Sequence, residues 1–104
     1  MKPLTSTVAG CTLLAATVYA LPALGQEQLA RSLAANCTGC HGPGGASSGA
    51  IPTIAGLERA YIITALQEFK AQTRPATVMH QLAKGYSDQQ IEILAEYFSK
   101  QKRQ

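Results

Sequence analysis

Tryptophan is absent from the 104 residues, and charged side chains make up only 14% of them. The formal net charge is +3, which is too weak to indicate a nucleic-acid-binding protein. The basic run from Lys100 to Arg103 is better explained as a solvated chain end. No segment alternates in hydrophobicity as a β-strand does, and no glycine-rich fingerprint follows a strand. The sequence therefore excludes a flavin-binding domain as well as a nucleic-acid partner.

A long apolar run is also missing at the N-terminus. The mostly apolar stretch from Leu13 to Leu24 is shorter than the roughly 20 residues that a membrane-spanning helix needs. It follows the positive Lys2 and ends at Ala23-Leu24-Gly25, with small residues where a signal peptidase reads. Residues 1–25 are therefore predicted to be a secretory signal peptide, cleaved after Gly25, and the protein to be periplasmic. An uncleaved anchor, or a lipid on Cys11, remains an alternative.

Cleavage would leave a single small domain. Removal of 25 of the 104 residues leaves the 79 residues 26–104. A chain of this size buries a modest share of its surface, so its core is marginal without a covalent link, a metal or a cofactor. We expect the fold to contain such a stabilising group.

Apolar residues recur at helical spacing through the mature chain, and no strand pattern interrupts them. The spacing predicts an all-α fold with three main helices and one short one, over 26–36, 58–70, 78–84 and from Ser87 onward. Gly85 is expected to end the short helix as its C-cap. Ser87 and Gln90 form a capping-box pair at the start of the last helix. The segment 42–52 is so rich in glycine that we expect a loop without a helix or strand.

Each of the three main predicted helices has one apolar face. Leu29, Leu33 and Cys37 share a face of the first helix. The corresponding residues of the two later main helices are Ile62, Ala65, Leu66 and Phe69, then Ile91, Leu94, Ala95 and Phe98.

The first helix runs into Cys37-Thr38-Gly39-Cys40-His41. Cys-x-x-Cys-His is the attachment signature of a c-type haem. Two thiols at this spacing can reach the two vinyl groups on one edge of a porphyrin, and the next residue is then directed under the iron. We predict one haem c, bound covalently through Cys37 and Cys40, with His41 as the proximal iron ligand.

The same cysteines allow other interpretations. A thioredoxin-like redox pair uses Cys-x-x-Cys, but strands would have to lead into the motif. A structural zinc site needs four ligands, and only Cys37, Cys40, His41 and His80 are available. A simple disulfide is the remaining alternative.

The iron would take a sixth ligand from a distant segment. A methionine opposite histidine is common in cytochromes and raises the reduction potential. Met79 is the only methionine left after cleavage, and it lies far enough from His41 for the chain to wrap around the haem. We predict Met79 as the distal ligand. His80, Lys84 and an iron without a sixth ligand are the alternatives, and a lone methionine can also serve only in packing.

The order of these features resembles a class I cytochrome c. The resemblance covers Gln26 to Gln101, through the haem motif, the glycine-rich loop with Ile51-Pro52-Thr53-Ile54-Ala55-Gly56, and a late methionine before a C-terminal helix. It implies that the carbonyl of Pro52 accepts a hydrogen bond from His41. It also implies that the first and last helices cross, so that Leu29 and Leu33 meet Leu94 and Phe98.

The segment from Val78 to Phe98 resembles the haem subunits of the flavocytochrome c sulfide dehydrogenases, above all in Ala83-Lys84-Gly85-Tyr86-Ser87 and the pair Tyr97-Phe98. The resemblance implies a partner, an FAD-containing sulfide dehydrogenase subunit that passes electrons to this haem, and a downstream cytochrome or other acceptor. The chain would be an electron-transfer subunit without catalytic residues of its own.

Two other functions stay open at this point. The chain could be a free periplasmic cytochrome that serves a terminal oxidase or reductase. A haem enzyme or ligand sensor would require an open distal position. The residues expected at the haem edge, Ile51, Ala76, Thr77 and Val78, are apolar or small. That composition favours a lasting, drier interface over a charged docking ring.

Overall fold

The computed structural model of the chain describes residues 1–4 and 21–103. Over these residues it has helices and no strand, which confirms the all-α prediction. The elements are α1 (Leu21–His41), the 3-10 helix η1 (Pro43–Gly45), α2 (Arg59–Lys70), α3 (Met79–Lys84) and α4 (Asp88–Ser99). None of the helices in the described ranges has the length and apolar character needed to cross a lipid bilayer.

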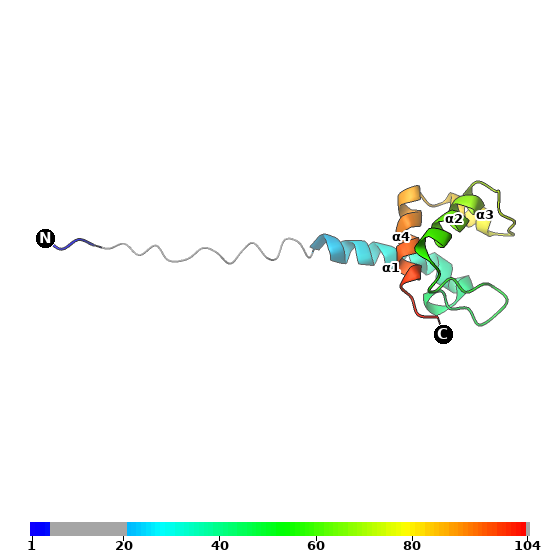
Figure 1. Cartoon of the computed structure of the whole chain (residues 1–104), viewed down its shortest axis with the longest axis horizontal. Coiled ribbons are helices and arrows are strands. Elements are labelled where there is room, and N and C mark those ends of the chain that lie inside the picture. The colour runs from blue at the N-terminus through cyan, green and yellow to red at the C-terminus, as the bar shows by residue number, and fades with distance from the viewer. Residues whose placement is uncertain (5–20, 104) are drawn as a thin grey trace.

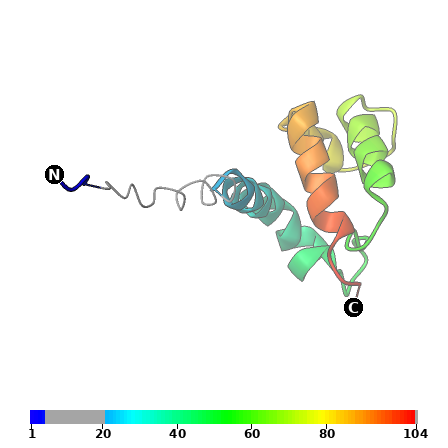
Figure 2. The same ribbon diagram turned by 60° about the vertical axis from the view of Figure 1, so that its left-hand side comes forward.

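Helix α4 is the centre of the fold. It contacts both α1 and α2, and α3 packs on α2. Figures 1 and 2 show α4 crossing α1 and running beside α2. All four residues predicted for its apolar face are buried, and the core is the cluster Ala34, Ile62, Leu94, Ala95 and Phe98. The crossing of the first and last helices is thus confirmed.

The start of α4 follows from local sequence. The backbone N–H of Gln90 donates to Ser87 Oγ at 3.1 Å, and the N–H of Ser87 donates to Gln90 Oε1 at 2.9 Å. These two bonds satisfy donors that a helix N-terminus would otherwise leave unpaired. The predicted capping box is therefore confirmed.

The middle helices lie within one residue of their predicted bounds. Glu58 and Val78 occupy the N-cap positions of α2 and α3 rather than their first turns. Gly85 is the C-cap of α3, as predicted. On α2 only Ile62 of the predicted face is fully buried, while Ala65, Leu66 and Phe69 are half-buried.

Helix α1 departs most from the prediction. It extends beyond 26–36 at both ends and carries the whole Cys-x-x-Cys-His motif in its last turns. Its buried residues are Ala30 and Ala34, with Leu33 partly buried against the core. Leu33 packs against the core cluster that contains Leu94 and Phe98, as expected, whereas Leu29 is 44% exposed and lies largely outside that core. Because one residue turns a helix by about 100°, the small alanines that face α4 leave Leu29 off that face.

The predicted signal peptide falls mostly outside the described residues. Positions 5–20, which include Cys11 and much of the apolar stretch, are not described. Gly25, the predicted cleavage position, lies inside α1, and residues 23–29 of that helix are exposed. Cleavage there would remove no buried residue from the described part of the fold. Cleavage itself stays a prediction.

The glycine-rich loop is better ordered than expected, because Pro43–Gly45 forms a 3-10 turn. The turn depends on Gly45, which has φ +80° and is buried. Its carbonyl accepts hydrogen bonds from the N–H groups of Ile54 (2.8 Å) and Ala55 (3.1 Å). The chain therefore returns to Gly45 at Ile54 and Ala55, and residues 46–53 form a loop closed by these hydrogen bonds.

Candidate functional site

Three chemically reactive residues share one face at the C-terminal end of α1. Residues at i, i+3 and i+4 of a helix are neighbours on its surface, so Cys37, Cys40 and His41 lie together. Cys37 is half-buried against the core, and Cys40 is exposed. The two thiols are not joined in a disulfide.

The tautomer of His41 follows from its contact with the returning loop. His41 Nδ1 lies 2.6 Å from the carbonyl oxygen of Pro52. A carbonyl can only accept a hydrogen bond, so Nδ1 carries the proton and Nε2 keeps its lone pair. A metal-binding histidine commonly donates its other N–H to such a carbonyl, which orients the ring. The contact implied by the sequence resemblance is thus present in the structure.

Cys37 lies beside Tyr86, which was named from the sequence only within the stretch that carries the family resemblance and not as a contact of the haem motif. Burial raises the pKa of the Cys37 thiol, and a hydrogen bond with the Tyr86 side chain partly offsets this rise. Tyr86 Oη also lies 3.4 Å from Asn36 Nδ2, and Lys70 Nζ donates to the Tyr86 carbonyl at 2.7 Å. The turn between α3 and α4 is therefore attached to the haem-motif end of α1.

The two candidate distal ligands occupy different environments. Met79 is the first residue of α3 and is half-buried. His80 Nε2 lies 2.5 Å from the carbonyl oxygen of Arg74, so this nitrogen carries a proton and is not free to bind a metal. Lys84, the third alternative, is exposed at the other end of α3.

The other interpretations of the cysteines lack support in the described part of the chain. No group of three or more His, Cys, Asp or Glu side chains there could hold a metal ion, so the zinc ligands Cys37, Cys40, His41 and His80 are not assembled. The strands that a thioredoxin-like motif requires are absent from residues 21–103.

The remaining donor set fits a haem. Two unpaired thiols and an imidazole with a free Nε2 share one helix face, and a thioether lies on a separate element. Apolar side chains that could contact a porphyrin or a partner are exposed in the loop and around α3, namely Ile51, Val78 and Leu82.

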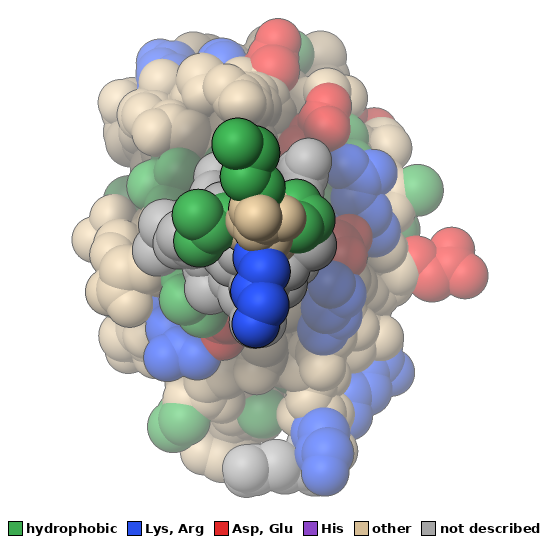
Figure 3. All heavy atoms as spheres, turned by 90° about the vertical axis from the view of Figure 1, so that its left-hand side faces the viewer, with side chains coloured by type: hydrophobic (Ala, Val, Ile, Leu, Met, Phe, Trp, Pro, Cys, Tyr) green, Lys and Arg blue, Asp and Glu red, His purple; other side chains and the backbone are tan. Residues whose placement is uncertain are grey.

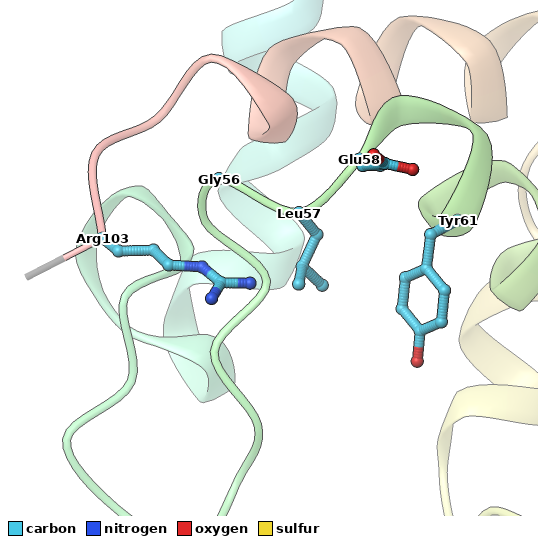
Figure 4. Close-up of a pocket in the computed structure, with 5 residues that line it drawn as sticks. All are labelled: Gly56, Leu57, Glu58, Tyr61 and Arg103. Carbon is cyan, nitrogen blue, oxygen red and sulfur yellow. The ribbon is translucent and has the colours of Figure 1, made fainter.

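A shallow pocket lies elsewhere and contains none of these residues. It is lined by Gly56, Leu57, Glu58, Tyr61 and Arg103. Figure 4 shows Arg103 extending from the C-terminal segment toward Leu57, with Tyr61 on the far side. Arg103 Nε donates to the carbonyl of Ala55 at 3.1 Å. This pocket therefore belongs to the junction that fastens the chain end to the loop.

Charges on the face shown in Figure 3 are mixed, with Lys and Arg side chains interspersed among Asp and Glu. Among the described residues, Arg59 of α2 pairs with Glu92 and Glu96 of α4. A face with both signs interspersed has no extended field of one sign.

Comparison with known proteins gives consistent matches. The family model described as cytochrome c matches residues 24–102. The cytochrome subunit of sulfide dehydrogenase from Chlorobaculum tepidum is 47% identical over 72 residues, which is 69% of this chain and 66% of that protein. The thiosulfate dehydrogenase electron acceptor of Thiomonas intermedia is 41% identical over 66% of this chain and 33% of its own length.

A solved structure of cytochrome c4 from Acidithiobacillus ferrooxidans matches with a TM-score of 0.65 and 31% identity. That match covers 72% of this chain and 49% of the solved chain. This chain therefore spans less than two thirds of the length of each of the three proteins named here.

Proposed function

Since the chain belongs to the cytochrome c family, we propose that it holds one haem c through Cys37 and Cys40 and transfers single electrons. The observation that carries this proposal is the hydrogen bond from His41 Nδ1 to the carbonyl of Pro52. It leaves Nε2 of His41 without a proton and available to iron, on a residue that shares a helix face with the two thiols.

Each residue has a separate task in this proposal. Cys37 and Cys40 would anchor the cofactor on α1, and His41 would bind its iron through Nε2. Pro52 orients the His41 ring and makes its Nε2 a better donor, because an accepting carbonyl increases the basicity of the imidazole. When bound, the haem supplies a one-electron couple between ferric and ferrous iron.

We assign Met79 as the distal ligand in preference to His80. The Nε2 of His80 is already bonded to the carbonyl of Arg74, whereas Met79 begins α3 next to the exposed apolar Val78. A thioether is a soft ligand that favours ferrous iron, so it raises the reduction potential relative to a second histidine. Such a site accepts an electron from a reduced flavin readily.

The Met79 assignment can be tested by the ferric absorption spectrum. The wild-type protein should show the weak charge-transfer band of sulfur bound to iron, and Met79→Ala should lose it while keeping the covalent haem. His80→Ala is the matched comparison. A wild-type spectrum without the band would contradict ligation by Met79.

For the partner, we propose an FAD-containing subunit that oxidises sulfide, with a second cytochrome or another carrier as the acceptor. Two relatives support a donor that oxidises reduced sulfur, because one is a subunit of sulfide dehydrogenase and the other an electron acceptor of thiosulfate dehydrogenase. The exposed apolar residues Ile51 and Val78 support a lasting contact with that subunit. This chain itself would carry out no sulfide oxidation.

The partner proposal is tested by purifying the haem-loaded protein from its native source and adding sulfide. A flavoprotein that co-purifies in equal amount, and reduction of the haem by sulfide only in its presence, is the expected result. Isolation of the haem protein alone, with rapid reduction by a soluble donor, would favour the free periplasmic carrier instead. Ile51→Lys should weaken the complex, while Lys102→Ala on the C-terminal segment should not.

We also propose that the protein acts in the periplasm after cleavage of residues 1–25. The exposure of residues 23–29 supports this, because the core does not depend on them. Mass spectrometry of the native protein should show a chain that starts at Gln26 and carries one haem. A mass that includes Met1 to Gly25 would indicate an anchor, and a lipid on Cys11 would indicate a lipoprotein.

A further inference from the structure

The segment between α2 and α3 is attached to α2 through the side chain of Arg74. Its Nε donates to Glu68 Oε2 at 2.8 Å, and its guanidinium carbon lies 5.5 Å and 5.6 Å from the ring centroids of Tyr61 and Phe69. A guanidinium within about 6 Å of an aromatic centroid is attracted to the ring. Because all three partners belong to α2, Arg74 has a defined position relative to that helix.

The backbone of Arg74 then connects to α3. His80 Nε2 donates to the Arg74 carbonyl at 2.5 Å, and the His80 ring lies 6.3 Å from that of Phe69. Residues 74 to 80 thus form a loop whose two ends both rest against α2. Met79 lies within this loop, one residue before its closing contact.

Helix α3 requires outside support because of its length. It has six residues, and Val78 at its N-cap offers no side-chain cap. Helices shorter than about 12 residues are not stable on their own in water. Ala83 is the buried residue of α3, whereas Val78 and Leu82 are exposed. The packing of α3 on α2 and the His80 contact therefore supply the outside support, and the His80 contact lies at the start of the helix.

We propose that His80 is a positioning residue that fixes the start of α3 through the Arg74 carbonyl and so keeps the sulfur of Met79 on the iron. The inference rests on the proposed ligation by Met79. It gives the neighbouring histidine a supporting task instead of the competing one that its place in the sequence suggests.

The test uses the ferric, haem-loaded protein and cyanide as the probe. Cyanide binds only where Met79 has left the iron, so its apparent affinity scales with that fraction of molecules. Loss of one hydrogen bond predicts about two- to tenfold tighter cyanide binding in His80→Ala, with a weaker sulfur-to-iron band. In His80→Gln the side-chain amide can donate to the same carbonyl, so the affinity should return to within about twofold of the wild type. Gln81→Ala, on the same helix and exposed, should change nothing.

A second readout does not depend on the iron. The N–H of Leu82 donates to the carbonyl of Val78 at 3.2 Å in the first turn of α3. Its hydrogen exchange should be faster in His80→Ala and normal in His80→Gln. If His80→Ala does not fold, Glu68→Gln, which weakens the attachment of Arg74, should raise the cyanide affinity and the Leu82 exchange rate in the same direction.

The outcomes separate the two proposals. A wild-type protein without the sulfur-to-iron band refutes ligation by Met79 whatever His80 does. A wild-type protein with the band, together with unchanged cyanide affinity in His80→Ala, refutes the positioning role alone. A His80→Ala variant that is less stable but binds cyanide as the wild type does refutes it too, since His80 would then act only in folding. If Glu68→Gln is used because His80→Ala does not fold, unchanged cyanide affinity in Glu68→Gln likewise refutes the positioning role.

Discussion

Replacement of Gly45 by alanine tests how the loop that carries Pro52 is held. Gly45 has φ +80°, and a Cβ there would lie 2.8 Å from both Ile54 Cγ1 and Phe98 Cδ1. Carbon atoms pack best at about 3.5–4.0 Å, so one side chain would have to move, and Phe98 is part of the core. The substitution therefore combines overpacking with a strained backbone.

The expected loss of stability follows from these two contributions. Overpacking of a core costs about 1–3 kcal/mol, and a left-handed conformation costs a non-glycine residue about 1–2 kcal/mol. Alanine recovers about 0.4–1 kcal/mol by restricting the unfolded chain. We expect Gly45→Ala to lower the free energy of unfolding by about 1–4.5 kcal/mol, a large share of the 5–15 kcal/mol typical of a domain.

Two neighbouring glycines provide matched controls. Gly44 also has a positive φ, +60°, but a Cβ there would meet only Gln101 Oε1 at 3.5 Å. Gly44→Ala should therefore cost only about 0.5–1.5 kcal/mol, from the backbone alone. At Gly49 a Cβ would meet nothing within 4 Å, so Gly49→Ala should stay within about 0.5 kcal/mol of the wild type.

Urea unfolding of the haem-loaded proteins, followed by far-UV circular dichroism, measures these differences. The comparison requires that the free energy of unfolding falls with urea concentration at the same slope in each protein. The order of stability should be Gly49→Ala, then Gly44→Ala, then Gly45→Ala. If Gly45→Ala and Gly44→Ala agree within about 0.5 kcal/mol, the close approach of Gly45 to Ile54 and Phe98 does not constrain the fold, and the reasoning fails.

Three further predictions concern the cofactor, the core and a helix cap. Covalent haem should survive a denaturing gel in the wild type and be lost when Cys37 and Cys40 are both changed to alanine; haem that extracts freely from the wild type into acidic organic solvent would contradict the attachment. Phe98→Ala should lower the free energy of unfolding by about 3–5 kcal/mol, measured by urea unfolding, and a loss below about 1 kcal/mol would show that Phe98 is not central to the core. Ser87→Ala should cost about 1 kcal/mol by removing the N-cap of α4, whereas Ser48→Ala in the exposed part of the loop should be neutral in the same measurement.

The features that could be predicted from the sequence depend on residues close together in the chain. The apolar face of α4 follows from a helical period, and its capping box from two residues three apart. The placement of Cys37, Cys40 and His41 on one side depends only on their spacing along a helix. These features can be predicted from the sequence because the residues that produce each one lie within one or two helical turns of one another.

Contacts between distant segments required the tertiary structure. The hydrogen bond between His41 and Pro52 spans 11 positions in the sequence, and the path of the intervening loop depends on the positive φ of Gly42 and Gly45. Only the family resemblance pointed to it. The approach of Tyr86 to Asn36 spans 50 positions and left no signal in the sequence pattern. A hydrogen bond of this kind depends on where the backbone of a second element lies, which spacing alone does not encode.

The sequence by itself determined that this chain is helical and that it carries a haem-attachment motif followed by one methionine and one histidine at 79 and 80. The tertiary structure alone decided that Ala30 and Ala34, not Leu29, face the core, because α4 packs against that side of α1. It also decided that His80 bonds to the Arg74 carbonyl, since Glu68, Tyr61 and Phe69 of α2 hold Arg74 within its reach. Met79 and His80 are adjacent in the sequence, but the fold places their side chains in different surroundings.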